Sequence, residues 1–447
     1  MKSENNAVRP PGDGRLPRVF AGLFGGLLGL SLLKFGNPAV LERVVEWPAD
    51  GYGWLFETWP AVIGYWLLGA VALVGVPVAC WKVKTPCWLV VLPLVWLGWQ
   101  FLAATQTVDA QLTRVTLKHF VACAGCFYLG FFSLGRRTPP FPFWSGLLCG
   151  FLIVIAVGVG QHFGGLEETR RYFYAYVYPQ SETVPPEFLK RLSSDRIFST
   201  LAYPNALAGV VLLLLPPILA VVWQMCGRLQ AVSQRLLVGL VGFSALACLY
   251  WSGSKAGWLL LLLTGLVVLL HLSFRRQFKA MVVVTLLVLG LAGFFWKYSG
   301  FFQRGATSVG ARFDYWRAAL QTTAAKPVFG TGPGTFAVAY KKIKEPQSEM
   351  TRLTHNDYLQ QASDSGIVGC AAYSLFIFGV LFCSYPRNGF GREPLRFSVW
   401  LGLLGLSLQS TVEFGLYIPA LSWTAFALMG WLLAVSGKRF DKQEPTR

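Results

Sequence analysis

Charged side chains are scarce in this chain of 447 residues. Asp, Glu, Lys and Arg make up 13% of it, against about a quarter in soluble domains. Hydrophobic residues make up 54%, and 17 residues are Trp. This composition excludes an ordinary soluble domain and predicts an integral membrane protein. The apolar runs are continuous rather than alternating, which favours an all-α, polytopic helical protein over a β-barrel.

The apolar runs predict about twelve transmembrane helices, since each contains roughly 20 apolar residues. We therefore expect a single membrane domain over residues 19–436, a polar tail at 1–18 and another at 437–447, and two long loops at 164–200 and 299–362. The helices are expected at 19–35, 58–80, 86–104, 115–134, 142–163, 203–225, 232–251, 256–273, 278–298, 366–385, 395–413 and 417–436.

Basic residues are unevenly divided between the two sides of the predicted membrane. The short loop 42–57 is acidic, whereas the short loops of the opposite side carry the basic pairs Lys82/Lys84, Arg136/Arg137, Arg228/Arg235 and Arg275/Arg276. The positive-inside rule then places both termini in the cytoplasm and the two long loops on the outer face. The formal net charge of +18 follows from this topology. We expect a lipid bilayer as a partner, and no nucleic acid.

Several kinds of residue are missing from the two long loops. They contain no cysteine, no D-x-D pair and no His/Asp/Glu cluster with metal-ligand spacing. We therefore expect no outer disulfide framework, no metal and no other cofactor. The loops do carry clustered Arg and Lys on the side where the positive-inside rule disfavours them, which predicts an anionic ligand there. Of the four histidines, His355 is the one in the interior of a long loop.

The second long loop has predicted structure of its own. Phe313, Trp316 and Leu320 recur at i, i+3 and i+7, so residues 310–325 predict a helix on the membrane surface. Lys326-Pro327 would end this helix, and a Gly/Pro turn, FGTGPGTF, follows at 329–336.

The segment around His355 fits a capping box, with Thr354 as the N-cap and Asp357 at the third position. This prediction places His355 in the first turn of a helix. The free N–H groups and the positive dipole end of such a turn favour anions.

An anionic ligand on the outer face suggests a particular chemistry. Because the outer face lacks ATP, a reaction there needs an already activated substrate, such as a membrane-bound, diphosphate-linked glycan. Its transfer to a hydroxyl requires a base and positive charge for the departing diphosphate. His355 is the candidate base, and Arg196, Arg312 and Lys255 are the candidate diphosphate ligands. The alternatives are a structural histidine and basic side chains that reach lipid phosphates.

Four stretches of the chain, in order, resemble the bacterial O-antigen ligase and O-antigen polymerase superfamily of membrane glycan transferases. They are RIFSTLAYPNALAG at 196–209, SGSKAG at 252–257, RFDYWRAAL…KPVFGTGPGTF at 312–336 and HNDYLQQASDSGIVG at 355–369. The resemblance covers roughly residues 185–415. The chain departs from the family pattern at Lys255, where arginine is commoner, and at Asp364 or Ser365, where the family usually has Glu.

This resemblance implies a C-type glycosyltransferase-like fold in the bacterial inner membrane. It implies transfer of a glycan from undecaprenyl diphosphate at the periplasmic face, without a metal and with inversion of the anomeric centre. His355 would activate the acceptor hydroxyl, and Arg196 and Arg312 would hold the diphosphate. Supporting roles near the histidine or the sugar would fall to Asn356, Asp357, Tyr358, Trp316 and Asn205.

The acceptor is the least determined part of this interpretation. We favour a ligase that transfers polymerised O-antigen to lipid A–core, because the loops are of modest size and lack an extra periplasmic domain. A polymerase of the same superfamily would instead extend a lipid-linked glycan. A protein O-oligosaccharyltransferase is a further alternative. A transporter of lipid-linked glycan would predict internal repeats and polar groups at mid-membrane.

Overall fold

The computed structural model describes residues 14–81, 85–135, 140–178, 189, 193–272, 274–303, 307–346, 348–386 and 389–436. Within these ranges the chain forms helices joined by turns, and no strand occurs. The all-α prediction is confirmed for this part of the chain. The basic pairs Lys82/Lys84 and Arg136/Arg137, most of the N-terminal tail and the whole C-terminal tail lie outside the described residues.

A long helix occupies the position of each predicted span. These helices are α1 (Arg15–Lys34), α3 (Ala61–Gly75), α4 (Cys87–Ala104), α5 (Ala110–Tyr128), α6 (Pro140–Gly160), α9 (Pro204–Met225), α10 (Ala231–Trp251), α11 (Lys255–His271), α12 (Arg276–Gln303), α15 (Asp357–Cys383), α17 (Pro394–Gln409) and α18 (Pro419–Ser436). Ten of them are long and apolar enough to cross a membrane, where α3 is counted together with the 3-10 turn at Val76–Val78 that extends it to 18 residues. The other two, α11 and α17, have 17 and 16 residues. The protein is therefore a multi-pass membrane protein.

Shorter helices connect or extend the long ones. The α-helices among them are α2 (Gly51–Phe56), α7 (Leu166–Tyr172), α13 (Thr307–Ala325), α14 (Phe336–Ile343) and α16 (Gly389–Arg392). The 3-10 turns are η1 (Ala39–Val44), η2 (Val76–Val78), η7 (Cys226–Arg228) and η8 (Gly415–Tyr417). Single π-helical stretches are η3 (Leu129–Leu134), η4 (Gln161–Gly165) and η5 (Phe173–Val177).

The core of the molecule lies around α9 and α18. In the most apolar 18-residue segment of each helix, 83% of the residues of α9 and 94% of those of α18 are buried, whereas only 6% of those of α12 are buried. Helices α1 and α6 approach closely because glycines face each other, with a Cβ on Gly29 placed 2.3 Å from the Gly146 carbonyl oxygen. Small residues allow this kind of contact in membranes. The buried helices therefore position the connections at their ends, and the connection between α17 and α18 is one of them.

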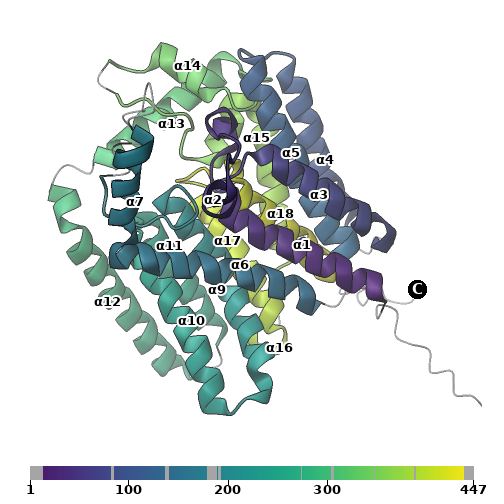
Figure 1. Ribbon diagram of the computed structural model, residues 1–447, viewed down its shortest axis with the longest axis vertical. Coiled ribbons are helices and arrows are strands. Elements are labelled where there is room, and N and C mark those ends of the chain that lie inside the picture. Colours follow the sequence, from purple (N-terminus) through teal and green to yellow (C-terminus); the bar gives the residue numbers. More distant parts are fainter. Residues whose placement is uncertain are drawn as a thin grey trace, which may run out of the picture.

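Helices α13 and α14 contact each other at one end of the molecule. In Figure 1 they lie at the upper end, with α7 below them on the left, and the turn that joins α9 to α10 lies at the lower end. The helix predicted at 310–325 is confirmed as α13, which ends at Ala325 just before Lys326-Pro327. The predicted turn at 329–336 is also present.

This glycine-rich turn is fixed against a kink in α15. Gly332 and Gly334 have φ values of +103° and +78°, which glycine adopts without a steric penalty. The Gly332 N–H donates to the Asp364 carbonyl oxygen at 2.8 Å, and the Gly334 N–H donates to Asp364 Oδ2 at 2.8 Å. The kink follows immediately, at Ser365 and Gly366. The turn therefore anchors the N-terminal half of α15 and the segment that precedes it, residues 351–356, which we call the histidine loop.

Candidate active site

The histidine loop ends in a cap that differs from the predicted one. Asn356 is the N-cap of α15, since its Oδ1 accepts from the Leu359 N–H at 3.0 Å. The Thr354 hydroxyl instead donates to the Asn356 carbonyl oxygen at 2.7 Å. The capping-box prediction is wrong for two reasons. Asn is as good a cap as Thr, and the Thr354 hydroxyl is already used in its hydrogen bond to the Asn356 carbonyl oxygen. His355 therefore lies before the helix and outside its first turn.

His355 has an unusual backbone conformation. Its φ of +52° lies in the left-handed region, which residues other than glycine adopt uncommonly. Such conformations cost on the order of 1–3 kcal/mol and cluster at functional sites. The imidazole packs edge-on against Phe414, with ring centroids 4.7 Å apart, and lies 5.9 Å from Tyr315. The loop thus holds the ring in one place, with 27% of the side chain exposed.

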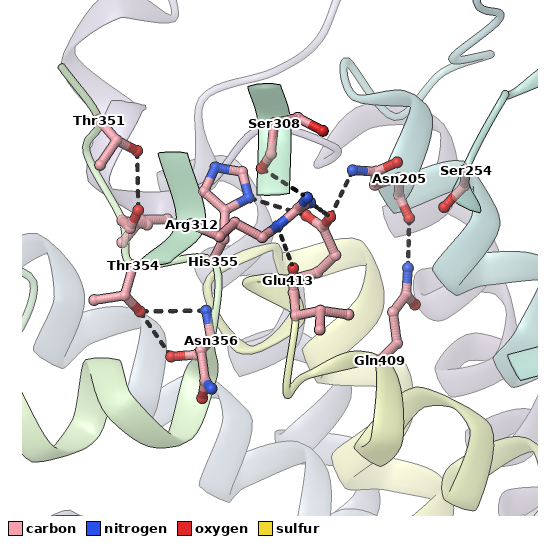
Figure 2. A network of polar contacts seen from close by, with 12 residues as sticks. Asn205, Ser254, Ser308, Arg312, Thr351, Thr354, His355, Asn356, Gln409 and Glu413 are labelled. Atoms are coloured by element: carbon pink, nitrogen blue, oxygen red, sulfur yellow. Dashed lines mark hydrogen bonds and ion pairs between the residues drawn. The ribbon is translucent and has the colours of Figure 1, made fainter. Parts of the chain in front are cut away.

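Glu413 is the centre of the polar network around this ring (Figure 2). It lies in the connection between α17 and α18. One oxygen, Oε2, contacts His355 Nδ1 at 3.2 Å, and Oε1 accepts from Asn205 Nδ2 at 2.6 Å. The Arg312 guanidinium from α13 forms an ion pair with the same Oε1. One carboxylate therefore joins α9, α13 and the histidine loop.

The charge of Glu413 is maintained although its side chain is only 8% exposed. Burial by itself raises the pKa of this carboxyl, but the hydrogen bond and charge of His355 and the charges of Arg312 and Arg196 outweigh it, so that the pKa is below its ordinary value. A carboxylate only accepts hydrogen bonds, so the His355 nitrogen facing it carries a proton. In neutral imidazole, Nε2 then keeps the lone pair.

Arg196 reaches the network through Asn205. Its Nη2 donates to Asn205 Oδ1 at 2.8 Å, and its Nε donates to the Ser252 carbonyl oxygen at 2.7 Å. Gln409 fixes the Asn205 backbone by donating to its carbonyl oxygen at 2.8 Å. Burial lowers the pKa of Arg196, and the Glu413 charge opposes that effect. The structure therefore brings Arg196, Asn205, Arg312 and His355 together.

Lys255 lies beside this group at the start of α11. Its Nζ is 5.3 Å from the centre of the Tyr298 ring, and it is close enough to Arg196 and Arg312 for their charges to act on it. Lys297 of α12 also interacts electrostatically with Arg196. The group formed by Arg196, Arg312, Lys255 and Lys297 therefore holds more basic charge than Glu413 alone neutralises. A local excess of positive charge attracts anionic ligands.

Three of the predicted supporting residues point elsewhere. Asp357 is buried and accepts from the Leu416 N–H at 2.9 Å. The Tyr358 hydroxyl donates to the Ser407 carbonyl oxygen at 3.0 Å. Trp316 packs against the small cluster formed by Tyr315, Ala318, Ala319, Phe336 and Tyr340. The described contacts of these three side chains are with other parts of the protein, and the acidic group in contact with His355 is Glu413.

Sequence reasoning missed Glu413 and Lys297. Glu413 is the last residue of the predicted span 395–413, so its place in the sequence suggests only a helix end. It is the only acidic residue between positions 394 and 436. An isolated ionisable residue next to apolar spans is a signal for function, and that signal could have identified it. Among the described residues, no group of three or more His, Cys, Asp or Glu side chains is placed to hold a metal ion.

Comparison with known proteins adds the family. Residues 240–374 match the family model described as O-antigen ligase. Over these residues the chain carries the domain of the O-antigen ligase and polymerase superfamily. The matched segment contains Lys255, Lys297, Arg312 and His355, whereas Arg196, Asn205 and Glu413 lie outside it. Members of this superfamily are bacterial membrane proteins, in agreement with the helices described above.

A relative from Haemophilus influenzae aligns with less than a third of the chain. It is an uncharacterized protein, 28% identical over 154 residues, and the alignment covers 29% of this chain and 39% of that protein. The chain thus spans less than half the length of this curated relative. The O-antigen ligase superfamily assignment therefore comes from the family match.

Proposed function

We propose that this protein is an O-antigen ligase of the bacterial inner membrane. It transfers a glycan from undecaprenyl diphosphate to a hydroxyl of lipid A–core at the periplasmic face. The observation that carries the proposal is the Glu413-centred network, because it joins a histidine with a defined proton position to guanidinium groups that suit a diphosphate. The family match supports the same class of reaction.

In this proposal His355 is the general base. The acceptor hydroxyl oxygen attacks the anomeric carbon, and the bond from that carbon to the diphosphate oxygen breaks. The hydroxyl proton moves to His355 Nε2, and the bonding electron pair leaves with undecaprenyl diphosphate. Glu413 stabilises the imidazolium that forms, in the way a carboxylate assists histidine bases elsewhere. A single displacement of this kind inverts the anomeric centre.

The basic side chains hold the leaving group. Arg196 and Arg312 use some of their N–H groups within the protein, and a guanidinium has five such donors. The remaining donors of Arg196 and Arg312, with the ammonium of Lys255, bind the diphosphate oxygens as negative charge develops on them. Fixed hydrogen bonds to Glu413, Asn205 and Ser252 keep these groups oriented before the donor binds. In this mechanism no step requires a metal.

A reconstitution experiment tests the proposal. Purified full-length protein is incubated with undecaprenyl-diphosphate glycan and EDTA, either with lipid A–core or without an acceptor. We expect glycan on lipid A–core, formed equally well with and without EDTA. Longer lipid-linked glycan in place of that product would identify a polymerase, the second candidate within the superfamily. Movement of the lipid-linked glycan across vesicles without any glycosidic product would contradict both and identify a transporter.

A further inference from the structure

A large apolar groove lies in the part of the chain that the proposed reaction does not use. It has a volume of about 900 Å³ and is lined by α3, α5, η3, the end of α4 and the loop after α4. Its wall includes Tyr65, Trp66, Ala72, Phe101, Leu117 and Val121. Trp66 is 71% exposed and Phe101 is 49% exposed. A groove of this size and composition on a membrane-spanning surface fits hydrocarbon chains.

Two basic side chains line one end of this groove. Arg114 and Lys118 are four residues apart on α5 and therefore lie on the same face of the helix. Both are exposed. Glu42 of η1 interacts electrostatically with Lys118, whereas no ion pair or hydrogen bond joins the Arg114 side chain to another of the described residues. This end of the groove is therefore suited to an anionic head group.

The basic end of the groove is also the end at which the candidate active site lies. Thr113, which precedes Arg114, donates to the Pro333 carbonyl oxygen at 3.0 Å, and the Val108 N–H donates to the Thr331 carbonyl oxygen at 2.9 Å. These bonds attach the start of α5 to the glycine-rich turn, which in turn anchors α15 and the histidine loop. A lipid in the groove would thus present its head group on the same side of the membrane as His355.

We propose that this groove binds the acyl chains of a phosphate-bearing glycolipid, with Arg114 and Lys118 against its phosphate, and that this lipid is the acceptor. The identification as acceptor rests on the function proposed above, whereas the binding of the lipid does not. The two lipids then approach from different sides. The acceptor lies along α3 to α5, and the donor diphosphate lies near α9, α11 and α13, on the other side of α15 and α18 in Figure 1.

Binding of lipid A to the purified full-length protein in detergent tests the proposal. The probes are bisphosphorylated lipid A and the same lipid without its phosphates, titrated against fluorescently labelled protein. The first variant is R114Q/K118Q, and its control is R228Q/R235Q, which removes two exposed basic residues at the other end of the molecule. The second variant is G69F, which fills the groove. Its control is G239F, because both glycines have open space around their Cβ positions.

We expect R114Q/K118Q to weaken the binding of bisphosphorylated lipid A roughly tenfold, given the contribution of basic residues to anionic-lipid binding. The dephosphorylated lipid should bind the wild type as weakly as bisphosphorylated lipid A binds R114Q/K118Q. G69F should weaken the binding of both lipids, and the two control variants should behave like the wild type. Wild-type affinity in both R114Q/K118Q and G69F would overturn the groove as a lipid site. Equal affinity of the wild type for the two lipids would overturn the assignment of the phosphate to Arg114 and Lys118.

Transfer assays separate the acceptor assignment from the proposed function. R114Q/K118Q and G69F should raise the KM for lipid A–core roughly tenfold and leave the KM for the donor unchanged. Unchanged acceptor KM in variants that no longer bind lipid A would overturn the acceptor role alone. If the wild type binds lipid A in the groove but transfers no glycan to any acceptor, the proposed function fails while the lipid site stands.

Discussion

Two groups of basic side chains lie at the same end of this molecule, and they are built differently. Around Glu413, the guanidinium groups are partly buried, hydrogen-bonded to fixed partners and balanced by a carboxylate. Along the α3–α5 groove, Arg114 and Lys118 are exposed and stand at the rim of an apolar surface. The first arrangement fixes atoms in place, and the second provides charge beside a large area for hydrocarbon.

This difference matches the two tasks of a transferase that joins two lipid-borne substrates. A leaving group needs donors in defined positions, because charge develops there at one moment of the reaction. A lipid that only has to be captured needs apolar area and a positive field, which tolerate many head-group positions. Removing one residue from the first group should therefore affect turnover or the capture of the donor, whereas changes in the second should affect the affinity for the acceptor alone.

The largest expected effect is that of His355→Ala. Removing a general base lowers the rate by about 10²–10⁴-fold, so kcat should fall by that factor while donor affinity and insertion into the membrane are retained. His162→Ala is the control, since His162 is exposed and stacks on Trp251 with ring centroids 3.8 Å apart. Initial rates of transfer to lipid A–core measure the effect. Full activity in His355→Ala would remove this residue as the base.

Glu413→Gln should have the next largest effect, on both stability and the pH profile. Breaking a buried ion pair costs about 3–5 kcal/mol. Because the pKa of Glu413 in the folded protein lies below the ordinary 4.5, its stabilisation is complete above that pH and is lost as the pH falls through the folded pKa. The melting temperature should therefore differ between wild type and variant at pH 7, and the difference should shrink below pH about 4.5.

The exposed Glu46→Gln is the control for this variant. If the role of Glu413 is purely structural, Glu413→Gln should lower the melting temperature and leave the pH optimum of the surviving activity unchanged. A Glu413 that orients His355 should also move the pH dependence of kcat, because the imidazolium loses its stabilising partner. A melting temperature difference that stays constant down to pH 3 would contradict the assignment of a charged Glu413.

Glu413 also shows where prediction from the sequence stopped. The helices, α13 among them, and the turn at 329–336 follow from local patterns, and His355 and Arg312 stand out by residue type and loop position. The partners of Glu413 are 58, 101 and 208 positions away in the chain, and no local pattern reports such distances. The predicted cap at Thr354 was wrong for a different reason, since Thr354 and Asn356 lie two positions apart and both residue types suit the N-cap.

Arg312→Ala should reduce donor capture about tenfold to a hundredfold, the range expected for hydrogen bonds to charged groups. Arg312→Lys should restore little of it, because an ammonium cannot contact Glu413 and a phosphate with a planar fork of donors. Arg317→Ala, an exposed position on the same helix α13, is the matched control. The KM for undecaprenyl-diphosphate glycan measures the effect, and full rescue by lysine would reduce the contact to a point charge.

The smallest effect should be that of salt concentration on the two KM values. A salt titration compares the basic group around Glu413 directly with the pair Arg114 and Lys118. Exposed charges are screened over about 8 Å at 0.15 M and about 3 Å at 1 M ionic strength, whereas buried pairs are screened much less. Raising NaCl from about 0.15 to 1 M should therefore increase the KM for lipid A–core a few-fold and change the donor KM little. R114Q/K118Q should lose this salt dependence. Equal salt sensitivity of both KM values would mean that the Glu413-centred group is as open to solvent as the groove, and would remove the distinction between them.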